Sequence, residues 1–354
     1  MSGVKRLALN IGIDPDRNSL RRQEISDRIK DSRNLRKISI GVDLGGTNIR
    51  FGLVTADGNI LRRLNIPTLV QEGPESVVGR IIETIIRLRR TRVQVQAVKS
   101  IGIGAAGVID HYKGIIHFSP NLPGWKEIHL KELIEKEIGI PVYVGNDVNA
   151  FTLGEFCFGA GVGSKSLFGI TLGTGVGGGI IINGKLLLGT NHAAGEVGHT
   201  SINAFGPKCK CGNMGCLERY VGAEYIVKRT IKRLKSQKSE IMKLAKNDHQ
   251  NITPEVIHLA VRKGDELAQN IIEETGFYIG IGLANVVSLI DPEIIVVGGG
   301  VSGFGKLLLD SIKKTMSERI MNFPGRRRKI VLSKLKDDAA ILGASQFENF
   351  LFPE

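Results

Sequence analysis

Glycine is concentrated in three short stretches of this chain, and these stretches limit the folds that the chain can adopt. The 45 glycines among 354 residues are not spread periodically, and they gather at Gly45–Gly46, Gly173–Gly179 and Gly298–Gly300. The first two stretches join pairs of β-rich runs, and the third follows the buried-strand pattern IIVVG. Because a backbone without Cβ atoms can approach a ligand closely, the stretches indicate ligand-binding loops on an α/β framework.

Hydrophobic periodicity around these loops predicts two α/β domains, which the chain length also favours. A hairpin over 38–54 should lead to a strand over 59–67, a helix over about 74–92, a strand over 98–104, a helix near 127–138 and a strand over 141–145. From about residue 147 a helix and two glycine-joined strands repeat this beginning, which indicates a weak internal duplication. Helices are then expected near 222–235, 253–263 and 266–289, before the strand over 294–298.

The domain boundaries follow from this pattern. We expect a basic extension over 1–37, a small α/β domain over 38–146, and a large α/β domain over 147–338. A last helix, at about 339–354, should pack back on the small domain. The extension carries ten Lys/Arg against five Asp/Glu, within a net charge of +13. Since no aromatic residues interleave these charges, we interpret them as solvated surface and expect no nucleic-acid partner.

The chain shows no signal for a membrane or for export. It contains no run of 18 apolar residues, and its N-terminus lacks the apolar stretch of a secretory signal. We therefore expect a cytoplasmic protein with no membrane partner.

Three of the four cysteines lie within CKCGNMGCLE, residues 209–218. In a reducing compartment such a group favours metal or redox chemistry over disulfides. One imidazole and three potential thiolates form the ligand set of a closed zinc site, offered here by His199, Cys209, Cys211 and Cys216. The spacing Cys-x-Cys-x4-Cys is uncommon among zinc fingers, so the residues favour zinc without excluding redox chemistry. A closed site would make the metal structural.

Two further motifs carry polar residues that suit catalysis or phosphate binding. DLGGTN, Asp43–Asn48, places an acid beside a loop whose N–H groups can meet phosphate oxygens, and an ordinary tight hairpin is the less favoured alternative. In VGNDVNA, Asp147 follows a strand and begins a helix, where a helix N-cap is the simpler interpretation of an isolated acid. LGTGVGGG, residues 172–179, is not a Walker A motif because no Gly-Lys-Ser/Thr ends it.

Taken in order, these motifs resemble the actin, hexokinase and Hsp70 ATPase superfamily, and more closely its ROK sugar kinases. DLGGTNIR, GND, LGTGVGGG, AGEVGH at 194–199 and CKCGNMGCLE carry the resemblance over about 38–350, and they are most like the zinc-containing bacterial glucokinases. The resemblance implies a two-domain actin-like (ribonuclease H-like) fold with a cleft between the domains. One departure is Ala106 in GAAGVID, where many members carry proline.

The resemblance also implies an activity, which is transfer of the γ-phosphoryl group of ATP to the 6-hydroxyl of glucose with Mg²⁺. Asp147 would be the general base, and the hexose would be held by Asn121, Asn146, Asp147, Glu196, His199 and Glu218. The nucleotide would be held by Asp43, the N–H groups of Gly45, Gly46 and Thr47, and by Asn48, Thr174, Gly175, Gly298, Gly299 and Gly300. Asp43 would orient a metal-bound water. The structural zinc would keep the sugar-binding side chains in register.

Alternatives remain within the resemblance. The sugar could be N-acetylmannosamine, N-acetylglucosamine, fructose or allose, and the donor polyphosphate in place of ATP. A sugar-responsive transcriptional regulator is a different class, since such members carry a winged helix ahead of the kinase fold. Only 37 residues precede the first predicted strand here, and the intact GND favours catalysis. The resemblance favours a homodimer without indicating its interface, any allosteric control or the role of residues 1–37.

Overall fold

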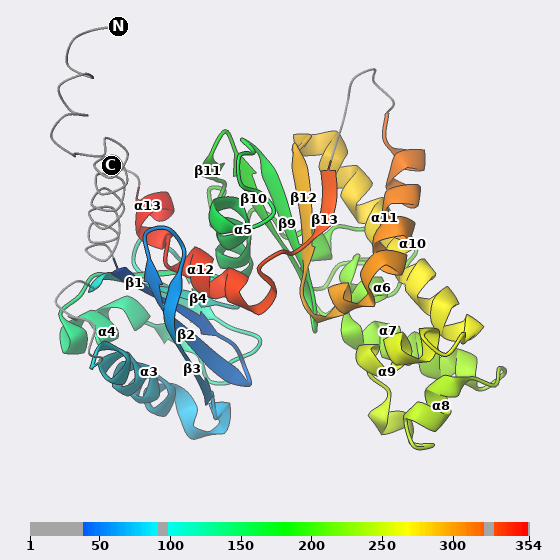
Figure 1. Ribbon diagram of the computed structural model, residues 1–354, viewed down its shortest axis with the longest axis horizontal. Coiled ribbons are helices and arrows are strands. Elements are labelled where there is room, and N and C mark those ends of the chain that lie inside the picture. Colours follow the sequence, from blue (N-terminus) through cyan, green and yellow to red (C-terminus); the bar gives the residue numbers. More distant parts are fainter. Residues whose placement is uncertain (1–37, 91–97, 322–328, 353–354) are drawn as a thin grey trace, which may run out of the picture.

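Two five-stranded sheets organise the molecule, and they have the same topology (Figure 1). The computed structural model describes residues 38–90, 98–321 and 329–352, so the expected extension over 1–37 lies outside the described residues. The first sheet has the order β3-β2-β1-β4-β8 and the second β11-β10-β9-β12-β13. In each sheet the first three strands are antiparallel and the last three are parallel. The matching order confirms the internal duplication.

The strands of both sheets fall where alternating and continuous apolar runs predict them. The first sheet contains β1 (Ile38–Leu44), β2 (Asn48–Thr55), β3 (Ile60–Pro67), β4 (Val98–Ala105) and β8 (Val142–Asn146). The second contains β9 (Leu167–Leu172), β10 (Val176–Ile182), β11 (Lys185–Leu186), β12 (Ile294–Gly298) and β13 (Lys329–Leu332). All five residues of β12 are buried, as its continuous apolar sequence requires.

Two helices pack beside the first sheet. In α3 (Gly73–Arg89) the residues Val77, Val78, Ile81, Ile85 and Leu88 are buried, which confirms the helical periodicity of this segment, although the helix ends three residues before the predicted end. The helix predicted near 127–138 begins later, as α4 (Leu130–Ile138).

A small third sheet accounts for the late start of α4. It contains β5 (Val108–Asp110), β6 (Ile115–Phe118) and β7 (Lys126–Ile128), in this order. Ile128 pairs with the buried Ile116 of β6, and Glu127 has φ +52, outside the helical region. Pairing with β6 therefore keeps residues 126–128 extended, in place of the predicted first helical turn.

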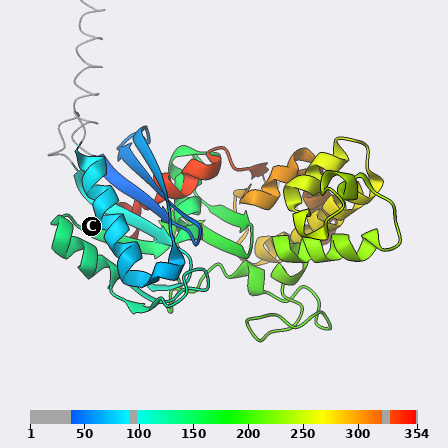
Figure 2. The ribbon, with the colours of Figure 1, turned by 90° about the horizontal axis from the view of Figure 1, so that it is seen from below.

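Most of the remaining helices belong to the part of the chain that contains the second sheet. They are α6 (Glu218–Val221), α7 (Ala223–Leu234), α8 (Glu240–Leu244), α9 (Pro254–Val261), α10 (Glu266–Ile290) and α11 (Gly305–Arg319). Figure 2 shows α7 to α11, yellow to orange, at the opposite end of the molecule from the first sheet. In the described part of the chain, no helix is both long and apolar enough to cross a membrane.

Two helices lie between the sheets, α5 (Asp147–Phe158) and α12 (Ala339–Ala344) (Figure 1). A Cβ added at Gly41 of β1 would lie 1.9 Å from the carbonyl oxygen of Ile341, and one at Gly102 of β4 would lie 1.7 Å from that of Ala344. Glycine is therefore required for α12 to lie directly on this sheet. This packing brings residues 339–344, near the end of the chain, onto the first sheet. The single final helix that the sequence predicts is two helices, α12 and α13 (Phe347–Leu351), because Ser345 and Gln346 interrupt it.

Candidate active site and metal cluster

The carboxyl ends of three parallel strands bring two acids together. Asp43 of β1 pairs in register with Gly104 of β4, and Gly104 pairs with Gly145 of β8, two residues before Asp147. A Cβ added at Gly104 would lie 3.5 Å from the Cα of Asp147. A Cβ there would also lie 3.0 Å from the Cβ of Ala150, so a glycine at position 104 lets the first turns of α5 (Asp147–Phe158) pack closely on β4.

Asp147 is the first residue of α5, and its Oδ1 accepts from the N–H of Val148 at 2.9 Å, but it is not the capping residue of that helix. The cap is Asn146, whose side-chain oxygen accepts hydrogen bonds from the N–H groups of Val148 at 2.9 Å and Asn149 at 3.3 Å. Burial raises the pKa of Asp147, and the negative charge of Glu196 raises it further. A carboxylate that is disfavoured in this way is suited to accept a proton. The capping role also commits the side-chain oxygen of Asn146, so a ligand would meet its amide N–H₂ group.

Asp43 belongs to a network of ion pairs with Arg50 and Asp337 that the sequence did not predict. Burial and the neighbouring Asp147 raise the pKa of Asp43 to about 6, against the opposing effect of Arg50. Arg50 Nη1 lies 3.6 Å from Asp43 Oδ2 and 3.6 Å from Asp337 Oδ1. Asp43 and Arg50 are direct cross-strand partners in the β1–β2 hairpin, so the predicted hairpin contained a signal for this pair. Nothing in the local sequence indicates Asp337, which is almost three hundred residues away.

The first glycine loop, residues 44–48, is supported by Thr68. This buried threonine donates from Oγ1 to the carbonyl oxygen of Gly45 at 2.7 Å and from its N–H to that of Thr47 at 2.8 Å. The N–H of Gly45 donates to the carbonyl oxygen of Asn48 at 3.1 Å, so it closes the turn and is not available for the phosphate contact expected of it. A Cβ at Gly46 would lie 2.7 Å from the carbonyl oxygen of Asn121, which places the predicted sugar-binding segment beside this loop.

The second glycine loop, residues 172–176, has Thr174 and Gly175 exposed at its tip. The N–H of Gly173 donates to the carbonyl oxygen of Gly175 at 2.9 Å, and the N–H of Val176 donates to Glu218 Oε2 at 3.0 Å. Glu218 is thus beside the predicted phosphate loop.

The third glycine stretch lies against the second loop. A Cβ at Gly299, where φ is +82, would lie 2.4 Å from the carbonyl oxygen of Leu172. Gly299 and Gly300 are exposed, whereas Gly298 is buried and a Cβ there would lie 2.4 Å from the ring of Phe151. The two exposed glycines can contact a ligand, whereas Gly298 allows the ring of Phe151 to pack against β12.

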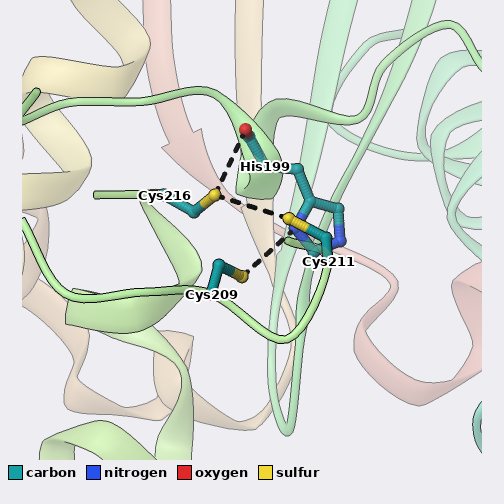
Figure 3. Close-up of side chains that lie close together, drawn as sticks. All are labelled: His199, Cys209, Cys211 and Cys216. Carbon is teal, nitrogen blue, oxygen red and sulfur yellow. Dashed lines mark hydrogen bonds between the residues drawn. The ribbon is translucent and has the colours of Figure 1, made fainter. Parts of the chain in front are cut away.

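The predicted metal ligands converge in the loop between β11 and α6 (Figure 3). The ligand atoms of His199, Cys209, Cys211 and Cys216 all lie within 4.8 Å of one another. Cys209 Sγ is 3.8 Å from His199 Nδ1, and Cys211 Sγ is 3.7 Å from Cys216 Sγ. Thiolates about 2.3 Å from a tetrahedral zinc ion lie about 3.8 Å from each other, so this set fits zinc. Burial raises the pKa of the Cys216 thiol to about 12 without a metal.

Comparisons with known proteins show what the whole chain is similar to. The family model described as "ROK family" matches residues 39–349. A glucokinase from Thermotoga maritima is 37% identical over 307 residues, which are 86% of this chain and 95% of the relative. A xylose repressor from Caldicellulosiruptor bescii is 33% identical over 305 residues, which are 86% of this chain and 76% of the repressor.

A solved structure shows the same likeness in three dimensions. It is the crystal structure of a ROK family glucokinase from Streptomyces griseus in complex with glucose and AMPPNP. This structure superposes with a TM-score of 0.76 at 35% sequence identity, covering 87% of this chain and 98% of the other.

Proposed function

This chain belongs to the ROK family, and we propose that it is an ATP-dependent kinase that phosphorylates the 6-hydroxyl of glucose. One observation carries the proposal: Asp147, an acid with a raised pKa, stands beside Asp43 at the edge of the first sheet, in a chain with two glycine loops suited to phosphate. The likeness to glucokinases from Thermotoga maritima and Streptomyces griseus, the latter with glucose and AMPPNP bound, supports this substrate pair.

In the proposed reaction, Asp147 accepts the proton of the attacking hydroxyl as the oxygen attacks the γ-phosphorus of ATP. Its raised pKa brings it closer to the operating pH, which favours general base catalysis. The sugar would be held by the residues that the family resemblance assigns, namely Asn121, Asn146, Glu196, His199 and Glu218. The charge of Glu196 acts on Asp147, which supports placing both at one sugar site.

Phosphoryl transfer depends mainly on positioning and on neutralising phosphate charge. The N–H groups of Gly46, Thr47, Thr174 and Gly175 would meet phosphate oxygens, with Asn48 at the end of the first turn. Gly299 and Gly300 would lie along the nucleotide. Mg²⁺, when bound with ATP, would neutralise charge on the β and γ phosphates. Asp43 would orient a water on this cation, while Asp147 stays free to act as the base.

The cluster of His199, Cys209, Cys211 and Cys216 would hold a structural zinc ion. Four protein ligands complete a tetrahedral site, so no position is left for substrate. The cluster lies between Glu196 and Glu218 in sequence, and a metal there would fix the backbone from which both side chains extend.

Three further properties are part of the proposal. The small domain would comprise residues 38–146 together with about 339–354, and the large domain residues 147–338. The substrate cleft would lie between the two domains. The protein would be cytoplasmic, which free cysteines within a metal cluster favour. It would form a homodimer, as the family resemblance favours.

A panel of sugars tests the function. Zinc-replete protein is mixed with Mg-ATP and glucose, fructose, allose, N-acetylglucosamine or N-acetylmannosamine, and ADP release is followed. We expect the highest kcat/KM with glucose. A preference for an acetylated sugar would keep the mechanism and change the substrate. The similarity to a xylose repressor makes a second test worthwhile: absence of turnover with every sugar, together with sugar-sensitive DNA binding, would overturn the proposal.

A further inference from the structure

A single short segment connects the metal cluster to the second glycine loop. It begins at Cys216, a buried member of the cluster, continues through the one-turn helix α6 that starts at Glu218, and ends at Ala223, the first residue of α7. Two of its residues contact the loop 173–176, which is the loop proposed to bind phosphate.

These contacts hold the loop at both ends. The carboxylate of Glu218 accepts the N–H of Val176 at 3.0 Å, and the N–H of Ala223 donates to the carbonyl oxygen of Gly173 at 2.9 Å. The residues between the two held positions are Thr174 and Gly175, the exposed tip. A Cβ at Gly175 would lie 2.9 Å from Glu218 Oε2, so the carboxylate lies directly against this tip.

The bond from Val176 matters because this residue is buried, with 4% of its surface exposed. A buried N–H without a partner is destabilising, so loss of the carboxylate would favour rearrangement of the loop. A charged acceptor also strengthens the bond relative to a neutral one.

We propose that Glu218 is a positioning residue for the nucleotide: through Val176 it fixes the phosphate loop, and it thereby links the metal cluster to nucleotide affinity. The inference rests on the proposed function, and it adds a second role to a residue that the family resemblance assigns to the sugar. Glu218 acts on the nucleotide only through the loop, so its effect should appear in the absence of sugar.

Three substitutions separate this role from sugar binding. Glu218→Ala removes the acceptor. Glu218→Gln keeps an oxygen that can accept from Val176 while it removes the charge. Glu218→Asp keeps the charge but shortens the side chain by one methylene, and it serves as the milder variant if the alanine variant does not fold. Glu266→Ala, which removes an exposed acid from the start of α10, is the matched control.

Binding of Mg-AMPPNP without sugar is measured by calorimetry on proteins with equal zinc content. We expect the Kd to rise about 10-fold in Glu218→Ala and about 5-fold in Glu218→Asp, and to change less than about 3-fold in Glu218→Gln. The control should match the wild type. Unchanged affinity in both the alanine and aspartate variants would overturn the inference alone. If the wild type itself bound no nucleotide, the proposed function would fail and the inference with it.

Discussion

The two glycine loops at the candidate active site occupy equivalent places in duplicated sheets, yet they are supported differently. The loop 44–48 is held by Thr68, a buried residue that directly follows β3 of the same sheet. The loop 172–176 is held by Glu218 and Ala223, which follow a member of the metal cluster. Duplicated loops can therefore depend on different structural elements: the first on its own domain's core, and the second on a segment that a metal can order.

The largest expected effect is that of replacing Asp147, the proposed base for transfer of the phosphoryl group that both loops would bind. Asp147→Asn should lower kcat by about 10²–10⁴ while the Kd for glucose stays within about 3-fold, because the amide keeps the shape but cannot accept the proton. Steady-state kinetics and glucose calorimetry measure the two quantities. Asp310→Asn, on the exposed face of α11, is the control. A near-normal kcat in Asp147→Asn would contradict the role of Asp147 as base.

Removal of one metal ligand should affect the second loop more than the first. Cys211→Ser should lose the metal, and the Kd for Mg-AMPPNP should rise about 10-fold or more as the support of the second loop loosens. Metal content is determined by mass spectrometry and affinity by calorimetry. Cys157→Ala, which removes the thiol outside the cluster, should keep both. A metal-free variant with wild-type nucleotide affinity would contradict the claim that the second loop depends on the metal cluster.

A matched pair of glycine substitutions sharpens the comparison further. The Cβ of Gly46→Ala would meet the backbone carbonyl oxygen of Asn121 at 2.7 Å, whereas that of Gly175→Ala would meet the carboxylate of Glu218 at 2.9 Å. The end of a flexible side chain such as the Glu218 carboxylate can shift by a few tenths of an ångström and still accept from Val176, whereas a backbone carbonyl cannot shift as easily. We expect Mg-AMPPNP affinity to fall about 10-fold in Gly46→Ala and about 3-fold in Gly175→Ala. The reverse order would show that the second loop is the less tolerant of the two.

The smallest expected effect is on stability. The pKa of Asp43 is about 6 in the folded protein, above its ordinary value of 3.8, so the ionised side chain disfavours the folded state. This destabilisation is complete above pH 6 and absent below pH 3.8. With allowance for partial exposure, Asp43→Asn should stabilise the protein at pH 8 by about 1–2 kcal/mol, a rise of about 1–3 °C in Tm for a chain of 354 residues, and should change little at pH 4. A lower Tm at pH 8 would contradict the assigned shift.

Local sequence patterns predicted most of the fold because each pattern reflects a local requirement. The run IIVVG defined β12 at both ends, and the repeat of apolar residues defined the buried face of α3. The prediction of a helical turn at residues 127–129 was wrong. In the structure Ile128 pairs with Ile116, and this strand pairing outweighs the helical pattern of the segment. Such pairing depends on a residue twelve positions earlier in the chain, which periodicity within the segment does not report.

At the candidate site, too, the features that local motifs carry were predicted and the contacts between distant segments were not. The motifs indicated Asp43, Asp147 and the four metal ligands, and the structure brings the ligand atoms together and the two acids next to each other. The supporting contacts were missed. Thr68 lies in an unremarkable strand end, and Asp337 reaches Arg50 only because α12 returns to the first sheet. Contacts between distant segments depend on the packing of whole elements, so short motifs do not encode them.

Phosphorus NMR of the reaction products tests the central claim most directly. Zinc-replete protein, glucose and Mg-ATP should give one new phosphomonoester, glucose 6-phosphate, in equal amount to the ADP formed. The Asp147→Asn variant should form it at least about 100-fold more slowly. Release of ADP with inorganic phosphate and no sugar ester, or no reaction of the wild type at all, would contradict the account.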